Sequence, residues 1–479
     1  MTAQNVGAAL EKLVAFTSKI EWDDIPQAVK TRAAFVLADD IGAMVAARAE
    51  PELIALQNGV AASAGPPEAT LFNAMGTRLD RYSAALANGC ASDWAELDEG
   101  YRRVICHAGI YCLPALLAEA EAENHTTADL LRALVLGYET VARVARCFTF
   151  PNLVLHPHGS LAAVGGAAAL CALRRLPEDV TIGAISSAAT MVLPGPYTHP
   201  IKGSLCRNIW PGISAQTAMR AVDWVGHGIK GLPSALHDVY ADAFGAAPDA
   251  AELGEGLGEA WAISDGYHKV FACCQYGHAT IEANLKLAQQ ADPNEIESIH
   301  LVTHEKARIM DNPDPDTTIA GKFSMQHIAA TSALNRSGGF EAFSAQVLSD
   351  PKVAALRQKV TMSAYDPVPG WPNDRPTRVE WTMKNGRQLT QEVMSARGGP
   401  DLPFGPDEIR TKIEGIVAPA YPAMFGILDI ILALDTEALN AKLPQKVTCK
   451  IVETEPVVKG QTAANSFKPA IPLLLSFFC

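Results

Sequence analysis

Residues 156–169 read HPHGSLAAVGGAAA, and this stretch indicates how the first half of the chain folds. Small side chains let helix backbones approach closely, so the alanine and glycine run predicts a helix buried inside a helical bundle. The free N–H groups of a helix start favour an anion, and His156 beside the Gly159-Ser160 step can exchange a proton near neutral pH. The stretch therefore predicts either a carboxylate site with its own acid–base group or a capped helix with an incidental histidine.

The rest of the first half has the same helical character. Apolar residues recur at helical spacing in a series of segments. These segments are residues 6–20, 25–47, 110–122, 127–145, 160–173, 180–191 and 212–225. We therefore expect an all-helical domain over residues 1–266.

The pattern then changes to one that mixes strands with helices. Residues 296–303 and 379–383 alternate apolar and polar side chains, which predicts strands. Asn385-Gly386 predicts a two-residue hairpin turn into a return strand over 387–394. Further helices are expected over 279–290, 322–334 and 353–359. Residues 267–400 should therefore form a smaller α+β lid domain.

The last part of the chain, residues 401–479, is expected to return to the helical domain. Helices are predicted over 407–417 and 424–435, and a short strand over 447–452. The apolar end LLLSFFC (473–479) is too short to span a bilayer, so it either packs against the protein or is an atypical chain end. The expected fold class is mainly α, with a large all-helical domain plus a smaller α+β lid domain.

Composition excludes several classes of protein. With 479 residues, 48% of them hydrophobic and 19% charged, the chain is globular and too long for one ordinary core. Its net charge of −13 argues against nucleic acid or an anionic membrane surface as a partner. No apolar run approaches the roughly 20 residues of a membrane span, and the N-terminus lacks a secretion pattern, so we expect a cytoplasmic protein.

The cysteines point to the same compartment. Ten are scattered along the chain without a C-x-x-C pair, so neither a disulfide framework nor a zinc site is expected. We interpret the adjacent Cys273 and Cys274 as small, buried and reduced side chains.

Polar clusters interrupt the apolar helical sequence, and the first of them is acidic. Four carboxylates gather in NGCASDWAELDEGY (88–101), and His107 follows just before a helix that starts with Ala-Gly. Crowded, partly buried acids raise one another's pKa and become candidate general acids. For Asp93 and Glu99 we favour the simpler interpretation of a solvated, acidic helix end.

Two further clusters carry cations. Lys202 and Arg207 precede a helix started by Gly212, an arrangement that holds a carboxylate by charge and by N–H groups, or that is merely a surface loop. YHKVFACCQYGH (267–278) lies at the expected domain junction, where ligand sites are common. Its polar members include Lys269, Gln275 and His278.

Taken in order, the clusters resemble the successive motifs of one family, MmgE/PrpD. The motifs are NGCASDWAELDE (88–99), HAG (107–109), HPHGSLAAVGGA (156–167), RNIWPGISA (207–215), YHKVFACCQYGH (267–278) and GKFSMQH (321–327). The family includes 2-methylcitrate dehydratase, cis-aconitate decarboxylase and iminodisuccinate epimerase, and the resemblance covers roughly residues 5–440. It implies a helical domain with an α+β lid, a homodimer, and no metal or organic cofactor.

The resemblance also places the family's functional residues. The acidic D-x-D motif falls on Glu96 and Asp98, and the histidine of H-P-G falls on His107. The histidine of H-P-T-G falls on His156, and the lysine of K-P-Y-P-C-C falls on Lys269.

Three positions depart from the family's pattern. Arg207 stands where many members have lysine, His327 where the F-S-x-x-Y motif has tyrosine, and Gly100 where a threonine follows the acidic motif. Arginine stays protonated and cannot act as a base, although it binds carboxylate well. The chemistry of the dehydratase and decarboxylase members therefore does not transfer automatically.

The members share a carbanion or enol formed next to a carboxylate, so the resemblance implies a lyase acting on a small di- or tricarboxylate. Catalysis would rest on His107, His156, Glu96, Asp98, Lys269 and His327. Substrate binding would rest on Arg207, Lys202, Ser160, Gln275 and His278. One alternative is an epimerase, which needs acid–base groups on both faces of the carbon, and another is a carboxylate-binding protein without catalysis.

Overall fold

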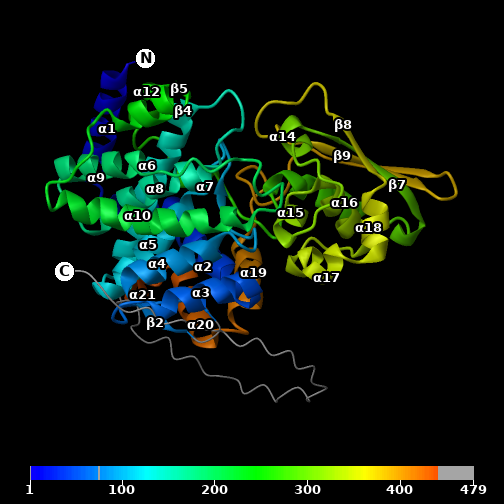
Figure 1. Ribbon diagram of the computed structural model, residues 1–479, viewed down its shortest axis with the longest axis horizontal. Helices are drawn as coiled ribbons and strands as arrows, with labels where there is room; N and C mark the ends of the chain where they lie inside the picture. The colour runs from blue at the N-terminus through cyan, green and yellow to red at the C-terminus, as the bar shows by residue number, and fades with distance from the viewer. Residues whose placement is uncertain (1, 74–75, 441–479) are drawn as a thin grey trace, which may run out of the picture. The chain divides into compact units, whose positions relative to one another are not determined.

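A helix of small residues lies among larger helices, as the opening stretch of sequence predicts. In the computed structural model this helix is α8 (Ala162–Leu173), and it packs against α5 (Ala108–Ala122), α6 (Thr127–Cys147) and α10 (Trp210–Val225). A Cβ atom on Gly166 would lie 2.7 Å from the Cβ of Ala218, so the close approach of α8 and α10 requires glycine. Figure 1 shows these helices stacked in layers.

The structure describes residues 2–73 and 76–440. The predicted strand over 447–452, two of the ten cysteines and the apolar segment 473–479 lie outside the described residues. The remaining long helices of the first half are α1 (Ala3–Thr17), α2 (Gln27–Ala46), α3 (Pro51–Ala62), α4 (Arg81–Ser92) and α9 (Glu178–Thr190). Shorter helices are α7 (Pro157–Ser160), α11 (Ala235–His237) and α12 (Ala250–Gly254).

The mainly helical fold is confirmed, but the expectation of helices alone over residues 1–266 needs correction. Two-residue strands pair within this part of the chain. The pairs are β1 (Ala69–Thr70) with β2 (Arg78–Leu79), and β4 (Phe148–Thr149) with β5 (Ala247–Pro248). A third pair joins β3 (Gly100–Tyr101) to β6 (Gly266–Tyr267). Such short pairs carry no periodicity that a sequence could reveal.

A four-stranded sheet forms in the second half, with the strand order β10-β9-β7-β8. Its strands are β7 (Ile296–Thr303), β8 (Val360–Ala364), β9 (Thr377–Met383) and β10 (Gln388–Val393). The β7–β8 pair is parallel and the other two pairs are antiparallel. The hairpin between β9 and β10 is confirmed, but the predicted two-residue turn is wrong. Met383 pairs with Arg387, so the turn has three residues, and of these only Gly386 adopts a positive φ, of 84°.

Helices cover this sheet and complete the second half. They are α13 (His278–Leu287), α16 (Met325–Leu334) and α18 (Pro351–Arg357), with the short α14 (Glu305–Arg308), α15 (Thr318–Lys322) and α17 (Ala345–Leu348). The sheet is tied to them by a buried bond, because the indole Nε1 of Trp381 donates to Asn284 Oδ1 at 2.9 Å.

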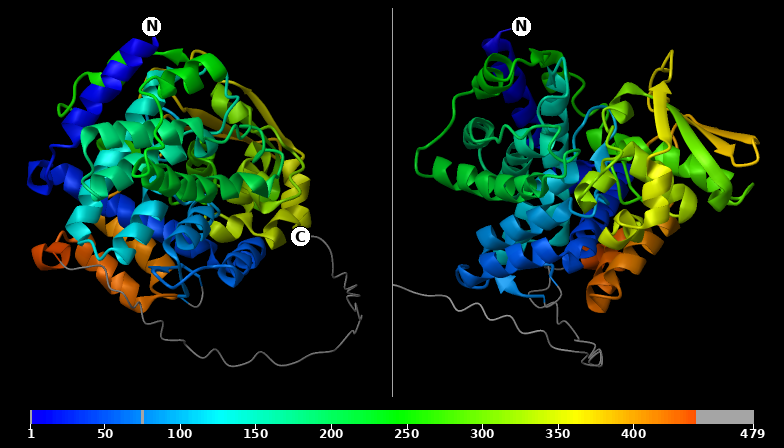
Figure 2. Two further views of the ribbon diagram at one scale, coloured as in Figure 1. Left: turned by 60° about the vertical axis from the view of Figure 1, so that its left-hand side comes forward. Right: turned by 45° about the vertical axis from the view of Figure 1, so that its right-hand side comes forward.

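The chain then returns to the first helices. α19 (Pro406–Val417) packs on α2 through Ile409, Ile413 and Val417, which are fully buried in the same apolar core as α2. α20 (Pro422–Leu432) also contacts α2, and α21 (Thr436–Asn440) follows. In Figure 2 the orange α19 and α20 lie beside the blue helices of the N-terminal part. Among the described residues, no helix combines the length and apolar character needed to cross a membrane.

Candidate active site

The acidic segment after α4 turns back into the protein. Asp93 caps the C-terminus of α4, and Glu96 adopts a positive φ of 53°. The segment then enters β3, whose pairing with β6 brings the backbone of Gly100 against Tyr267. A Cβ at Gly100 would overlap the Tyr267 ring, so glycine at this position follows from that close approach.

This pairing brings Lys269 to the acidic segment from the other half of the sequence. Lys269 Nζ donates to Asp98 Oδ1 at 3.0 Å and lies 3.5 Å from Glu96 Oε2. Burial alone would lower the pKa of Lys269, but the two carboxylates outweigh it and raise that pKa. Lys269 is therefore a fixed cation in the site.

His107, the residue that precedes α5, contacts the same carboxylate. Its Nδ1 lies 2.6 Å from Asp98 Oδ2 and 3.0 Å from the carbonyl oxygen of Glu99. A carbonyl oxygen only accepts hydrogen bonds, so Nδ1 carries a proton and donates. Burial would raise the pKa of Asp98, but Lys269 and His107 hold it below its ordinary value. In the neutral ring of His107, Nε2 is then the basic nitrogen.

Arg207 provides a second fixed cation. Its Nη1 lies 2.8 Å from Asp93 Oδ2 and 2.5 Å from Glu96 Oε1. Despite complete burial, which would lower the pKa of Arg207, the two carboxylates raise it. Burial raises the pKa of Asp93 well above its usual range in spite of Arg207.

The interpretation of Asp93 and Glu99 as solvated is wrong, because both side chains are fully buried. Glu99 accepts hydrogen bonds from the N–H of Gly109 at 2.6 Å and from the hydroxyl of Tyr138 at 3.1 Å. Burial raises the pKa of Glu99 to about 8. The acidic motif thus supplies structural carboxylates beneath the site as well as those that face it.

Three histidines lie side by side next to this cluster. The ring of His158 is 4.7 Å from that of His107 and 4.4 Å from that of His156. The backbone N–H of His158 donates to His156 Nδ1 at 3.3 Å, so the proton of a neutral His156 resides on Nε2. Burial, followed by the charge of Arg207, lowers the pKa of His156 well below its usual value. His156 is therefore a neutral hydrogen-bond donor.

The two helix starts that the sequence suggested as anion sites do not serve that purpose. His156 itself caps α7, a single turn, and Ser160 donates back to the His156 carbonyl oxygen at 3.4 Å. Gly212 lies inside α10, where a Cβ would overlap the backbone of α4. The close crossing of α4 and α10 therefore explains why position 212 is a glycine.

The charged and histidine side chains surround one small cavity. Of the candidates from sequence, Glu96, His107, His156, Arg207, Lys269 and Gln275 line it. The other lining residues are Tyr101, Val104, Ile105, Tyr197, Tyr267, Cys274, Tyr276, Phe323 and Arg375. Asp98 stands behind the cavity wall, where it holds His107 and Lys269.

Four candidates from sequence lie elsewhere. Lys202 is exposed, Ser160 is buried in α7, and His278 bonds the carbonyl oxygen of Cys273 through Nε2 at 3.3 Å. His327 packs against Phe343 with its Nδ1 3.4 Å from an Arg357 nitrogen. None of the four lines the cavity.

Sequence reasoning missed Arg375 and the four tyrosines of the cavity. Arg375 precedes β9, about a hundred residues from the junction motif, with no neighbouring polar motif to single it out. Tyr101, Tyr267 and Tyr276 stand within the quoted motifs but were not singled out, and only the fold shows that they line the cavity together with Tyr197. Cys274, expected to be buried, is partly exposed and lines the cavity, whereas Cys273 is buried.

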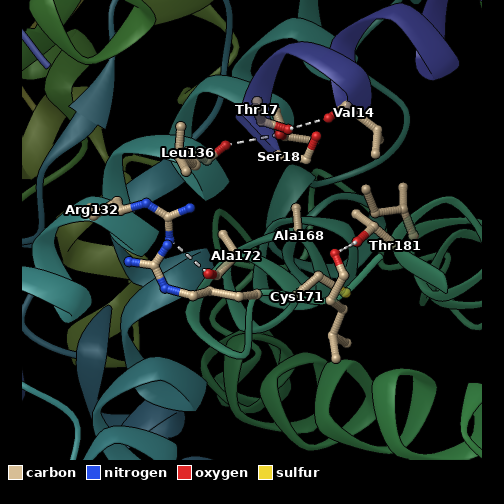
Figure 3. Close-up of a pocket in the computed structure, with 13 residues that line it drawn as sticks. Val14, Thr17, Ser18, Arg132, Leu136, Ala168, Cys171, Ala172 and Thr181 are labelled. Atoms are coloured by element: carbon tan, nitrogen blue, oxygen red, sulfur yellow. Dashed lines mark hydrogen bonds between the residues drawn. The ribbon is translucent and has the colours of Figure 1, made fainter. Parts of the chain in front are cut away.

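A second small cavity lies among α1, α6, α8 and α9 (Figure 3). Arg132 in its wall donates to the carbonyl oxygen of Ala172 at 2.9 Å. The lining contains no histidine, lysine or carboxylate, so it offers no acid–base group. Among the described residues, one group could gather around a metal ion: His237, Asp238 and Asp242, whose two carboxylates are exposed.

Comparison with known proteins shows the family of the chain. The MmgE/PrpD N-terminal domain matches residues 11–247 and the MmgE/PrpD C-terminal domain matches residues 271–435. The chain therefore belongs to the MmgE/PrpD family.

Individual relatives are more distant. The chain is 24% identical to cis-aconitate decarboxylase of Aspergillus terreus, over 91% of this chain and 95% of that protein. It is 23% identical to a cis-aconitate decarboxylase-like protein of Aspergillus oryzae, over 75% and 81% of the two chains.

A different match is short. Elongation factor P of Ruegeria pomeroyi is 74% identical over 46 residues, which are 10% of this chain. The chain spans only 25% of the length of that relative. A match of this size defines neither the fold nor an activity of the chain.

Proposed function

We propose that the protein is a lyase that forms a carbanion next to a carboxylate of a small di- or tricarboxylate. The carrying observation is that His107 and His156 line one cavity with opposite hydrogen bonding at Nδ1, between the cations Lys269 and Arg207. Nδ1 of His107 donates to a carbonyl oxygen, whereas Nδ1 of His156 accepts from a backbone N–H. Nε2 of His107 is then available as a base, and Nε2–H of His156 is available as a hydrogen-bond donor. Membership of the MmgE/PrpD family and the decarboxylase relatives support a lyase.

His107 is the residue that moves the proton. Its Nε2 takes a proton from the carbon next to the carboxylate, and the electron pair of that C–H bond passes into the carboxylate as an enediolate. Asp98 stabilises the resulting imidazolium through Nδ1 at 2.6 Å. Proton transfer by a positioned group of this kind accelerates such reactions by about 10²–10⁴-fold.

His156, Lys269 and Arg207 stabilise the enediolate. The Nε2–H of His156 donates a hydrogen bond to an enediolate oxygen. A neutral imidazole suits this role because it donates the hydrogen bond without transferring its proton to the enediolate. Lys269 and Arg207 supply positive charge that burial keeps from being screened by water. Residues 267–400 act as a lid, since Lys269, Gln275 and Arg375 enter the cavity from this part of the chain.

Collapse of the enediolate decides the product. In a dehydratase the C–O bond breaks, a C=C bond forms, and His107 returns its proton to the departing hydroxide as water. A decarboxylase forms the carbanion by C–C and not by C–H cleavage: the bond to a carboxyl group breaks, carbon dioxide leaves, and a His107 that starts protonated on both nitrogens gives its Nε2 proton to the carbanion. Return of the proton to the opposite face of the carbon would instead make the protein an epimerase.

Proton NMR in deuterium oxide tests this function. The panel is 2-methylcitrate, citrate, cis-aconitate, tartrates, malates and iminodisuccinate. A new alkene signal, or loss of a carboxyl group as carbon dioxide, supports the lyase and identifies its reaction. Deuterium incorporation with inversion and no new alkene replaces the lyase with an epimerase. Binding in calorimetry without turnover makes the protein a carboxylate-binding protein, and silence in both assays overturns the proposal.

A further inference from the structure

Arg375 differs from the other two cavity cations in what it is paired with. Arg207 and Lys269 each lie within 3.5 Å of two carboxylates of the acidic segment. Arg375 Nη2 donates to the carbonyl oxygen of Arg102 at 3.2 Å, and Nη1 donates to the amide oxygen of Gln275. Both partners are neutral, so they leave the charge of Arg375 uncompensated.

The carboxylate nearest to Arg375 is already engaged by another arginine. Asp374 Oδ2 lies 3.7 Å from Arg375 Nε, beyond hydrogen-bond distance. Arg102 holds both oxygens of Asp374, at 2.6 Å and 3.2 Å. Two arginines thus share one carboxylate, and Arg375 Nε is buried without a hydrogen-bond partner in the described part of the chain.

A buried cation that shares its one nearby carboxylate with another arginine is costly, and the side chain of Arg375 is only 7% exposed. Tyr276 packs against the guanidinium, with 5.0 Å between the ring centroid and Arg375 Cζ, which fixes its direction. The wall that carries Arg375 is positive, whereas the charges of Arg207 and Lys269 are balanced by those of the acidic segment. The cavity is therefore polarised.

We infer that Arg375 binds a second carboxylate of the substrate, the one remote from the reacting carbon, and that it restricts the enzyme to substrates with at least two carboxylates. This inference rests on the proposed function. The first carboxylate lies among Lys269, Arg207 and His156, where the enediolate forms. Gln275 orients the guanidinium by accepting from Nη1, so that its remaining N–H groups face the ligand.

The test compares pairs of ligands that differ by one carboxylate. The probes are succinate with butyrate, and malate with 2-hydroxybutyrate, titrated into the full-length protein by calorimetry. The variants are Arg375→Gln and Arg375→Lys, and the matched control is Arg378→Gln, an arginine of β9 that is 40% exposed and pairs with Glu380. A charged hydrogen bond of this kind contributes about 10–100-fold in affinity.

We expect the unmodified protein to bind the member with the extra carboxylate at least about 10-fold more tightly. Arg375→Gln should abolish this preference while leaving the affinity for the smaller acid unchanged, and Arg375→Lys should restore part of it. Arg378→Gln should behave like the unmodified protein. Equal losses for both members of a pair, or no loss, would overturn the role of Arg375.

The result also separates this inference from the proposed function. If the unmodified protein turns over a carboxylate and Arg375→Gln keeps the same KM, only the inference fails. If the preference for the extra carboxylate depends on Arg375 but no substrate of the panel is turned over, only the lyase fails. If the unmodified protein binds none of the four probes, both fail.

Discussion

At the scale of single residues, the two cavity histidines should have separable roles. His107→Asn keeps a donor for Asp98 but removes the basic Nε2, so kcat should fall by about 10²–10⁴-fold. His156→Gln keeps a donor near the enediolate and should lower kcat by a smaller factor, about 10-fold. Both are measured by steady-state kinetics on whichever substrate the NMR panel identifies.

His227→Gln is the control for these variants, because His227 is exposed at the end of α10. Its kinetics should match those of the unmodified protein. If His107→Asn retained full activity, His107 would not be the group that moves the proton.

Glu99 should make stability depend on pH. Its pKa is about 8 in the folded protein against an ordinary value of 4.5, because burial disfavours the charged form. Between these two values the unfolded chain has released the proton that the folded protein still holds, so stability falls as pH rises. Glu99→Gln keeps an acceptor for the Gly109 N–H, and it should remove this contribution to the decrease of the free energy of unfolding with pH.

Chemical denaturation at about pH 6.5 and pH 8 measures the effect. Between these two pH values, the free energy of unfolding should fall by about 1–2 kcal/mol more in the unmodified protein than in Glu99→Gln. Glu255→Gln, a change at an exposed carboxylate, should leave the slope as it is. An equal shift of stability at both pH values would mean that the substitution merely disturbs packing.

The residues of the site could be found from sequence only where motifs carry them. His107, His156, Lys269 and Arg207 stand in recognisable segments, and the fold brings them to one cavity. His327 also stands in a motif, yet it lies beside Arg357 and away from the cavity. Burial of Asp93 and the position of Arg375 depend on contacts between distant segments, which a single sequence does not encode in any local pattern.

At the scale of elements, glycine at the crossing of α4 and α10 should be essential. A Cβ on Gly89 would lie 2.5 Å from the Cα of Gly212, and one on Gly212 would overlap the carbonyl oxygen of Leu86. Gly212→Ala should therefore lower the free energy of unfolding by at least about 1–3 kcal/mol. Because Arg207 immediately precedes α10, the same change should also weaken carboxylate binding.

Thermal unfolding and calorimetric titration measure the two effects. Gly415→Ala is the matched control, since Gly415 lies inside α19 with nothing within 4 Å of a new Cβ. It should stabilise the protein by about 0.5–1 kcal/mol through helix propensity. An unchanged melting temperature in Gly212→Ala would show that the helices can separate at no cost.

Periodic elements were predictable and short ones were not. The long helices and the strands β7, β9 and β10 follow apolar spacing over many residues. Two helices of 12 residues each, α3 and α4, were not predicted. The five-residue strand β8, at the edge of the sheet, was not predicted either. The pair β3–β6, which brings Lys269 to Asp98, consists of two residues on each side and has no periodic signal.

At the scale of the whole molecule, a buried lysine near the end of the described chain supports the cavity. Lys412 of α19 donates through Nζ to the carbonyl oxygen of Leu97, between Glu96 and Asp98, and to Asp39 Oδ1 of α2. Asp39 Oδ2 in turn lies 2.8 Å from Nδ1 of His268, the neighbour of Lys269. Three segments far apart in sequence thus meet at one buried carboxylate.

Removal of Lys412 should therefore affect both stability and catalysis. Burial would raise the pKa of Asp39, and Lys412 followed by His268 holds it below its ordinary value. Lys412→Met leaves that carboxylate buried with less compensation, which should cost about 3–5 kcal/mol. Because the carbonyl of Leu97 loses its donor, and Asp39, the partner of His268, loses its cation, Glu96 and Lys269 should shift, and kcat should fall more than KM changes.

A double variant distinguishes positioning from plain destabilisation. Asp39→Asn in the Lys412→Met background removes the unpaired charge, so the melting temperature should partly recover, with a coupling of about 1–3 kcal/mol. Activity should not recover, because the acidic segment still lacks its tie to α19. Lys384→Met, at a lysine whose side chain is 51% exposed, is the control and should change neither quantity. If the double variant regained kcat together with stability, Lys412 would act only by balancing charge, and the return of the chain to α2 would be a matter of folding and not of catalysis.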